Sequence, residues 1–391
     1  MHIFQLWREY KLSIAELLHI FPRGKVAYHS TDVIALNWLK TELVLEKAPS
    51  IGGTIKIMKS IETENFEDFI VEKAKEKEWK FTYWASIWWE KQNIKAILGN
   101  IKHKLREADI SSRYINKDFE NLSSAQIIGE KLVSSETDYN FIDTGNKIIR
   151  AKTIWVQDIE TYSQRDYGKK RDMVVGMLPP KLCQMMINIS RNTKSKSDDI
   201  AVYDPFVGLG TLLIESLYMW HATVYGSDLN ENMVKATRTN LWNIKKENVN
   251  DFTFELQNLN AKDIGNSKIL KSFKVDSIVS EGYLWEMMTR KNISRERIES
   301  QAVILCPLYE EFFAWLQKLN YKGSIVISFP FWEITWKYFY SEGIYDILNK
   351  YCQIQEFFPQ YMDIEPTKTG SLLYKRDKQM VGREIFKLKM K

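Results

Sequence analysis

Residues 201–211 decide the fold of this chain and read Ala201-Val202-Tyr203-Asp204-Pro205-Phe206-Val207-Gly208-Leu209-Gly210-Thr211. An apolar strand enters a turn that contains two glycines, and an apolar helix over residues 212–220 leaves it. Glycine adopts backbone dihedrals that other residues avoid, and it lets a ligand approach the main chain closely. Free amides at the start of the helix favour a negatively charged group in the same space. The stretch therefore predicts a ligand-binding turn between a strand and a helix.

The second landmark is the predicted strand over residues 223–228, which ends in the acid Asp228. In open α/β sheets the ligand lies beyond the carboxyl ends of the strands, and a carboxylate there can accept both hydroxyls of a ribose. The glycine turn is not G-x-G-x-x-G and no G-K-[ST] follows it, so neither a dinucleotide nor a nucleoside triphosphate is indicated. We therefore predict a nucleoside-cofactor site. An ordinary βαβ turn with glycines at a helix start is the alternative.

The glycine turn resembles the Asp-Pro-Phe-Cys-Gly-Ser-Gly-Thr loop of amino-group methyltransferases that use S-adenosylmethionine, with Val207 and Leu209 in place of small residues. Residues 176–182 are similar to the family segment that forms the wall over the methionine end of the cofactor. Asn260 stands at the third strand end, where the family uses an Asp beside the adenine. The resemblance implies S-adenosylmethionine as the cofactor, bound by Asp204, Phe206, Gly208, Gly210, Thr211, Asp228, Asn260 and Met177.

Length and composition limit the other possibilities. A chain of 391 residues predicts two or three domains. Its apolar runs are shorter than the ~20 residues of a membrane helix, and the sequence has no signal-peptide pattern, so no membrane partner is expected. Three scattered cysteines predict no disulfide framework and a reducing, cytoplasmic location. Five isolated histidines predict no metal site, and 55 basic against 50 acidic residues neither require nor exclude a nucleic acid.

The residues before the glycine turn resemble the front of a known enzyme family. Residues 1–62 contain Leu12-Ser13-Ile14-Ala15-Glu16-Leu17 and Gly52-Gly53-Thr54-Ile55-Lys56, which are similar to the ferredoxin-like start of tRNA guanosine methyltransferases. Residues 63–160 resemble a THUMP domain, the RNA-binding module of several tRNA-modifying enzymes. A polar, basic connector over residues 164–170 then leads into the methyltransferase-like domain, 165–391.

The predicted fold class is α/β. Strands alternate with helices from residue 201 to residue 358, which favours a mostly parallel sheet. Residues 371–375 and 383–388 predict a terminal hairpin, which fits an antiparallel close of that sheet. The expectation is a Rossmann-like class I methyltransferase domain that follows an α+β ferredoxin-like and THUMP region.

One segment of the THUMP-like region is locally positive. Between Lys91 and Lys117 seven residues are basic and only two are acidic, although the whole chain is nearly neutral. On charge alone the segment is a solvated helix face. Its position in a THUMP-like region favours contact with tRNA instead. The candidate RNA-binding residues are Lys102, Lys104, Arg106 and Arg113.

The end of the fourth strand departs from the family pattern. Methylating an exocyclic amine needs its lone pair turned out of conjugation and aimed at the methyl group, by acceptors that hold the amine hydrogens. The family does this with Asp or Asn, two prolines and an aromatic ring that stacks on the flipped base. This chain has Ser280-Glu281-Gly282-Tyr283. We predict Glu281 as the acceptor and Tyr283 as the stacking ring, with Ser280 or a backbone carbonyl as the alternative acceptor.

The resemblance implies methyl transfer to the N2 amine of a guanosine in tRNA, at position 10, by a protein of tRNA processing. The first alternative is a catalytically weakened THUMP and methyltransferase-fold protein that binds tRNA. The second is a DNA amino-methyltransferase, which shares the glycine loop and has no reason to carry a THUMP-like front. The sequence leaves open the tRNA species, the modified position, mono- or dimethylation, and the need for a small activating subunit as a second partner.

Overall fold

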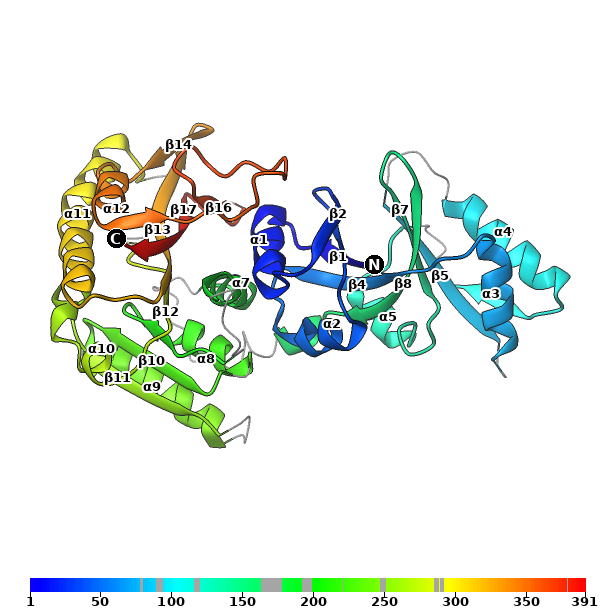
Figure 1. The fold of residues 1–391 in the computed structure, drawn as a ribbon, viewed down its shortest axis with the longest axis horizontal. Helices are drawn as coiled ribbons and strands as arrows, with labels where there is room; N and C mark the ends of the chain where they lie inside the picture. The colour runs from blue at the N-terminus through cyan, green and yellow to red at the C-terminus, as the bar shows by residue number, and fades with distance from the viewer. Residues whose placement is uncertain are drawn as a thin grey trace. The chain divides into compact units, whose positions relative to one another are not determined.

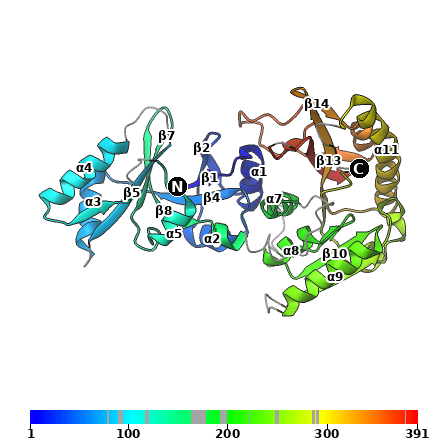
Figure 2. The same cartoon turned by 180° about the vertical axis from the view of Figure 1, so that it is seen from behind.

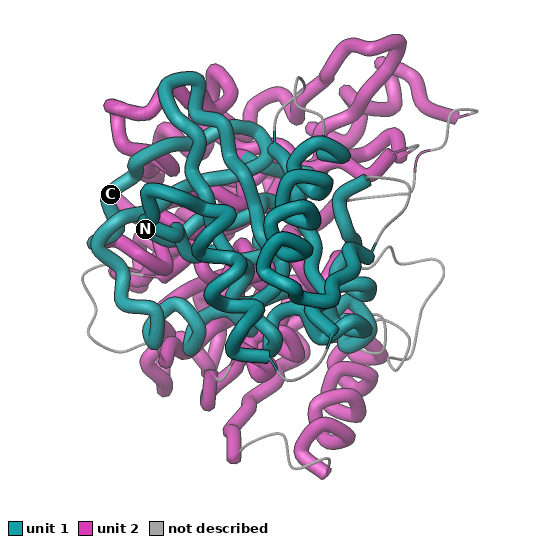
Figure 3. Tube along the Cα trace, turned by 90° about the vertical axis from the view of Figure 1, so that its right-hand side faces the viewer, with its two compact units in different colours: residues 1–10, 23–49, 53–164 teal, residues 11–22, 50–52, 165–391 magenta. Residues whose placement is uncertain are grey.

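The computed structural model describes residues 1–77, 80–88, 94–115, 120–162, 178–191, 199–219, 221–246, 251–284, 288, 292–377 and 379–391. The chain divides into two compact units (Figure 3). Unit 1 comprises residues 1–10, 23–49 and 53–164, and unit 2 comprises residues 11–22, 50–52 and 165–391. Residues 11–22 and 50–52 therefore cluster with unit 2, although the sequence places them in the N-terminal domain. The separation of residues 1–62 from 63–160 stays a prediction.

Unit 1 is built on one mixed sheet with the strand order β2-β3-β1-β4-β8-β7-β5-β6 (Figure 1). The strands are β1 (His2–Leu6), β2 (Lys25–His29), β3 (Val33–Asn37), β4 (Thr54–Ser60), β5 (Phe81–Trp88), β6 (Ser112–Tyr114), β7 (Asp138–Asp143) and β8 (Ile148–Val156). The helices of this unit are α2 (Thr41–Lys47), α3 (Phe66–Lys75), α4 (Ile94–Glu107) and α5 (Ser124–Gly129). Helix α4 buries Leu98, Ile101 and Leu105, an apolar stripe at helical spacing, and turns its charges to solvent.

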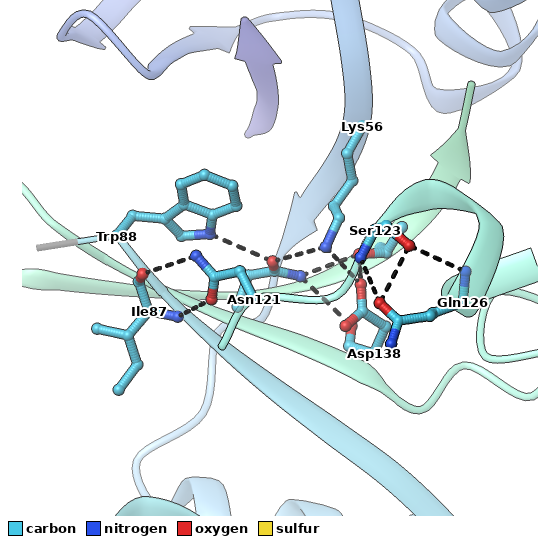
Figure 4. A network of polar contacts seen from close by, with 9 residues as sticks. Lys56, Ile87, Trp88, Asn121, Ser123, Gln126 and Asp138 are labelled. Atoms are coloured by element: carbon cyan, nitrogen blue, oxygen red, sulfur yellow. Dashed lines mark hydrogen bonds and ion pairs between the residues drawn. The ribbon is translucent and has the colours of Figure 1, made fainter. Parts of the chain in front are cut away.

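A buried ion pair lies inside the unit 1 sheet. Lys56 of β4 donates to Asp138 of β7 over 2.8 Å, and both side chains are almost fully buried. Thr153 of β8 donates to the same carboxylate, and Asn140 donates to Thr153 over 3.0 Å. Trp88 donates to Asn140 over 3.3 Å, as Figure 4 shows beside the ion pair. This polar network joins β4, β7 and β8 in a region where a lone charge would be costly.

Unit 2 contains the predicted doubly wound sheet, with the strand order β11-β10-β9-β12-β13-β17-β15. The strands of this path are β9 (Val202–Asp204), β10 (Thr223–Asp228), β11 (Thr253–Asn258), β12 (Ser277–Ser280), β13 (Ser324–Ile334), β15 (Cys352–Ile354) and β17 (Val381–Met390). Strands β11, β10, β9, β12 and β13 pair in parallel, and β17 pairs antiparallel with β13 and β15. The predicted α/β fold class is confirmed, including its antiparallel close.

The helices of unit 2 cover this sheet (Figures 1 and 2). They are α1 (Tyr10–Ile20), α7 (Pro180–Ser190), α8 (Thr211–Tyr218), α9 (Glu231–Lys246), α10 (Lys268–Ser272), α11 (Arg295–Lys318) and α12 (Ile344–Tyr351), with a 3-10 turn at Ala261–Asn266. Helix α11 packs against α12, and α7 against α8. The main core lies between α11 and the sheet, where Tyr309, Phe312 and Phe313 belong to one buried cluster with Ile278 and Ile325. Within the described residues no helix is long and apolar enough to cross a bilayer.

Two additional strands extend this sheet. Strand β13 continues through Pro330 to Ile334 and pairs with β14 (Lys337–Tyr340). Proline normally marks the edge of a ladder because it has no N–H to donate. Here β13 has left its parallel neighbour β12 by Ser328 and pairs with β17 on its other side. Strand β16 (Leu372–Tyr374) pairs with β17 and completes the predicted terminal hairpin.

Helix α1 is held in unit 2 by a buried carboxylate. Glu16 is fully buried and accepts from the Gly52 amide over 2.9 Å and from the Asn188 side chain over 2.7 Å. Asn188 lies on α7, and its amide also donates to the Ser50 carbonyl over 2.8 Å. These charge-assisted hydrogen bonds compensate for the burial of Glu16 and connect residues 11–22 and 50–52 to α7.

Candidate functional site

The predicted glycine turn joins β9 to α8 and contains two residues in the left-handed region. Gly208 has a φ of 52° and Gly210 a φ of 81°. A Cβ at Gly210 would lie 2.7 Å from the Thr237 Cγ2 atom, so this position has neither the dihedral nor the space for another residue. A Cβ at Gly208 would meet no atom within 4 Å. The backbone at Gly208 is therefore open to a ligand.

Helix α9 and Asp228 fix the shape of this turn. The Thr237 hydroxyl donates to the Gly208 carbonyl over 2.7 Å, and the Asn240 amide donates to the Leu209 carbonyl over 3.0 Å. The Gly208 amide donates to Asp228 Oδ2 over 2.9 Å, and the Asn230 amide to Oδ1 over 2.9 Å. Each carboxylate oxygen has two acceptor positions, so Asp228 keeps capacity for ribose hydroxyls. The structure thus brings the two landmarks of the sequence, the glycine turn and Asp228, into direct contact.

Asp204 connects the glycine turn to the fourth strand. Its carboxylate accepts from the Phe206 amide over 3.0 Å and from the Ser280 hydroxyl over 2.6 Å. Both Asp204 and Ser280 are buried, and burial raises the pKa of Asp204 to about 7. The Ser280 oxygen also accepts from the Gly282 amide over 3.1 Å. Ser280 therefore ties the end of β12 to the end of β9.

The raised pKa predicts how Asp204 changes stability with pH. An unfolded Asp ionises near pH 4, while native Asp204 keeps its proton to about pH 7. Between these values the native state holds one more proton, so its contribution to the free energy of unfolding falls by about 1.4 kcal/mol per pH unit as pH rises. In Asp204→Asn this fall is expected to disappear. Urea unfolding from pH 4 to pH 8 measures it, and equal slopes in both proteins would contradict the prediction.

The predicted catalytic segment follows β12 as a constrained turn. Gly282 has a φ of 70°, and a Cβ there would lie 2.4 Å from the Ser328 carbonyl and 2.7 Å from the Tyr309 hydroxyl. Ser328 donates to the Glu281 carbonyl over 2.6 Å, and the Tyr283 amide donates to the Tyr309 hydroxyl over 2.8 Å. Tyr283 itself is 43% exposed. Glycine at position 282, where the family has proline, therefore lets the chain turn tightly against β13 and α11.

Sequence reasoning missed the partner of Glu281. Arg383 of β17 contacts Glu281 Oε1 with two nitrogens, Nε over 2.7 Å and Nη2 over 2.6 Å. Arg383 is 5% exposed, so the pair is largely withdrawn from water. Both contacts use the same carboxylate oxygen, and Oε2 keeps its lone pairs. The sequence indicated only that Arg383 begins a predicted strand. Its contact with Glu281 could not be predicted, because it depends on the register of β17 against β13.

The structure describes three of the remaining predicted cofactor residues, Phe206, Thr211 and Asn260. The Phe206 ring packs on Tyr309 and Phe312 with centroid separations of 5.9 and 6.4 Å. Thr211 begins α8. The Asn260 side chain caps the 3-10 turn by accepting from the Lys262 amide over 3.2 Å. Met177 lies outside the described residues.

The predicted RNA-binding residues lie in unit 1. Lys102, Lys104 and Arg106 are exposed on α4, outside its buried stripe. The Lys102 ammonium lies 5.4 Å from the Tyr114 ring centroid. Arg113 of β6 donates to the Glu130 carboxylate over 2.9 Å, which neutralises its charge locally. The described part of the chain contains no cluster of three His, Cys, Asp or Glu residues that could hold a metal ion.

Residues 168–294 match a family model, UPF0020, described as an RMKL-like methyltransferase domain. The matched range contains the glycine turn, Asp228 and the segment after β12. The predicted Rossmann-like methyltransferase domain is therefore confirmed, and S-adenosylmethionine is its cofactor. The open backbone at Gly208 and the adjacent Asp228 carboxylate fit the methionine and ribose parts of that molecule. No curated protein matches the chain by sequence.

Several solved structures match part of this chain at low similarity. NSun6 from Pyrococcus horikoshii with SFG is 16% identical, with a TM-score of 0.37 and coverage of 65% of this chain and 68% of that one. P. horikoshii TYW2 in complex with MeSAdo is 15% identical, with a TM-score of 0.33 and coverage of 68% and 81%. The rRNA methyltransferase aviRa from Streptomyces viridochromogenes is 10% identical, with a TM-score of 0.36 and coverage of 60% and 94%. Likeness at this level says nothing about the substrate of this chain.

Proposed function

We propose that this chain transfers the methyl group of S-adenosylmethionine to the exocyclic N2 amine of a guanosine in tRNA, at position 10. The observation that carries the proposal is the position of Glu281. Glu281 directly follows β12. The residue before it, Ser280, donates a hydrogen bond to Asp204 at the start of the glycine turn. An acceptor for amine hydrogens is therefore connected directly to the turn that holds the cofactor.

The cofactor supplies a methyl group on a positively charged sulfur, and the protein supplies position and charge. Arg383 engages Oε1 of Glu281, which leaves Oε2 to accept a hydrogen from the amine. The exposed ring of Tyr283 follows two residues later and supports stacking of a base turned out of its helix. A carboxylate held by a buried guanidinium needs no rearrangement as positive charge develops on the nitrogen. This arrangement replaces the Asp-Pro-Pro pattern of the family.

Different residues are proposed to bind different parts of S-adenosylmethionine. Asp228 would hold the ribose, and the amides of the glycine turn would face the methionine part. Asn260, two residues after the end of β11, would lie beside the adenine. The contribution of Met177 to the methionine wall remains a proposal from the family resemblance.

Contact with tRNA is proposed for α4 and β6 of unit 1. Lys102, Lys104 and Arg106 present three exposed cations on one helix, which suits the evenly spaced charges of a phosphate backbone. Arg113 already pairs with Glu130, so it would have to exchange that partner for a phosphate. Phosphate contacts fix the orientation of the RNA, and the choice of base is left to the site in unit 2.

The decisive experiment incubates the protein with S-adenosylmethionine labelled in its methyl group and with total tRNA or duplex DNA. Label in tRNA, recovered as N2-methylguanosine from position 10, supports the proposal. Label in DNA would favour the DNA amino-methyltransferase. Binding of cofactor and tRNA without transfer would favour the catalytically weakened tRNA-binding protein, and tRNA methylated at another atom would contradict the N2 assignment.

Replacing Lys102, Lys104 and Arg106 with Ala is expected to weaken tRNA binding and its dependence on salt. Each phosphate contact that is lost removes counterion release, so the slope of log Kobs against log salt should flatten by about 2 to 3. The affinity for S-adenosylmethionine should not change. Filter binding at several salt concentrations measures the effect. The matched control replaces three exposed lysines of unit 2, Lys268, Lys271 and Lys322. Equal slopes in the two triple variants would mean that α4 is a solvated face.

A further inference from the structure

The hairpin of β13 and β14 has a turn that its residue types do not favour. Ile334 pairs with Lys337, so Thr335 and Trp336 form a two-residue connection. Their φ values are 48° and 66°, as a type I′ turn requires. That turn normally contains Asn-Gly, and a positive φ is an outlier for a β-branched or bulky residue. Strained conformations of this kind concentrate at ligand sites. The Trp336 side chain is 90% exposed at the tip.

The two faces of this hairpin differ in their surroundings. On one face Trp332 is fully buried and packs with Ile334 and Phe339 in a small core that also contains Ile298. That face anchors the hairpin to α11. On the opposite face Tyr338 and Tyr340 are partly exposed.

The open face of the hairpin is aromatic. Tyr338 and Tyr340 alternate along β14 and lie beside Phe331, with ring centroids 5.2 and 6.0 Å from it. Tyr338 is 49% exposed and Tyr340 37% exposed, whereas Phe331 is buried beneath them. With Trp336 at the tip, exposed rings therefore recur at every second residue from 336 to 340. Rows of aromatic rings on a sheet face are a platform for stacked bases.

The charges around these rings suit a polyanion. Glu333 is the acidic residue of the hairpin on the open face, and its carboxylate pairs with Lys375 over 2.5 Å. A second acid near Tyr340, Glu384 of β17, is buried. Lys337 lies next to Trp336 and is exposed. Because Lys337 pairs with Ile334, it belongs to the other face of the hairpin, beside the tip. An aromatic face whose hairpin carboxylate is neutralised, with a cation near its tip, matches unpaired nucleotides, which offer flat bases and negative phosphates.

The hairpin is an extension of the strand that supports the catalytic segment. Ser328 of β13 donates to the Glu281 carbonyl, and Ile334 lies six residues further along the same strand. At about 3.3 Å per residue the tip lies roughly 20 Å beyond that bond. In Figure 1, β14 lies at the upper edge of unit 2. Any RNA that places a base at Glu281 has its neighbouring nucleotides within reach of the hairpin.

We propose that the aromatic hairpin, residues 331–340, is a stacking platform for unpaired nucleotides that flank the target base. The inference rests on the proposed function and narrows its substrate class. The RNA would need single-stranded nucleotides beside the reacting guanosine. A continuous duplex would offer no unpaired base to stack on the rings of the hairpin.

The test uses the full-length double variant Thr335→Asn/Trp336→Gly and the single variant Tyr338→Ala. Asn-Gly is the preferred type I′ sequence, so the double variant removes the ring while it favours the hairpin. Loss of one stacked base should weaken binding of labelled oligouridylate about 5- to 150-fold. Binding of duplex RNA and of S-adenosylmethionine should stay unchanged. The KM for tRNA should rise by a similar factor with little change in kcat. The control is Trp242→Ala, an exposed ring on α9.

The outcomes separate this inference from the proposed function. Unchanged oligouridylate affinity and KM in a protein that still methylates tRNA would overturn the platform and leave the function standing. Equal losses for duplex RNA and oligouridylate would also overturn it, since stacking on unpaired bases would not be the cause. A change of oligomeric state in the variants, seen by sedimentation, would show that the face binds a second copy instead. A wild-type protein that binds cofactor and no RNA would reject both proposals.

Discussion

Glu281→Gln is expected to slow methyl transfer to tRNA by about a hundred- to a thousand-fold. Glutamine keeps the size and one acceptor oxygen of Glu281, and it loses the charge that stabilises a developing ammonium. The affinities for S-adenosylmethionine and tRNA should stay close to wild type, because neither contact depends on this carboxylate. Single-turnover methylation with labelled cofactor measures the rate, and titration calorimetry measures the two affinities.

The buried Arg383 requires a control for this variant. Removing one partner of a buried pair leaves the other charge uncompensated, and that alone can destabilise a protein. Thermal unfolding of Glu281→Gln and of Glu281→Gln/Arg383→Gln separates lost chemistry from lost stability. Tyr283→Ala should differ from both, since loss of a stacking ring weakens productive binding as well as rate. A wild-type rate in Glu281→Gln would assign the acceptor role to Ser280 or to a backbone carbonyl.

Asp138→Ala is expected to lower the stability of unit 1 by about 3–5 kcal/mol. The change leaves the Lys56 ammonium buried in the sheet without its carboxylate, and uncompensated buried charges carry this cost. Replacing both residues, as Lys56→Met/Asp138→Leu, should cost less than Asp138→Ala, because neither charge then remains and the main loss is the acceptor of the Thr153 hydroxyl. Urea unfolding measures both effects.

An exposed ion pair of the same sheet provides the comparison. Lys152 and Glu136 lie 2.7 Å apart, with side chains 23% and 49% exposed. Lys152→Ala should cost less than about 1 kcal/mol, since water solvates the remaining carboxylate. Similar losses in Asp138→Ala and Lys152→Ala would mean that burial does not decide the cost.

The parts of the site that could be predicted from the sequence are local. Gly208 and Gly210 sit in a strand-turn-helix pattern, and their positive φ values follow from the geometry of such a turn. Asp228 ends the next strand, and parallel strands bring their carboxyl ends to the same edge. Regular elements that are neighbours in the sequence therefore predict that Asp228 and Gly208 lie at the same edge of the sheet, and the hydrogen bond between them appears only in the structure.

The parts that could not be predicted depend on register between distant strands. Arg383 reaches Glu281 across a separation of 102 residues, through the pairing of β17 with β13. A shift of one residue in that pairing would turn the guanidinium to the other face of the sheet. The β13–β14 turn was missed for another reason, because Thr335 and Trp336 carry none of the turn chemistry that marks a hairpin in a sequence. Unusual residues in a strained turn point to a role outside folding.

The buried Glu16 has a consequence for the order in which the protein is made. Its partner Asn188 follows 172 residues later, so at about 5–20 residues per second the carboxylate is synthesised about 10 to 30 s before that amide. All of the strands of unit 1 that follow β1 are synthesised in that interval. We expect the sheet of unit 1 to form first on the ribosome, while the earlier-made helix α1 stays in water until α7 is available.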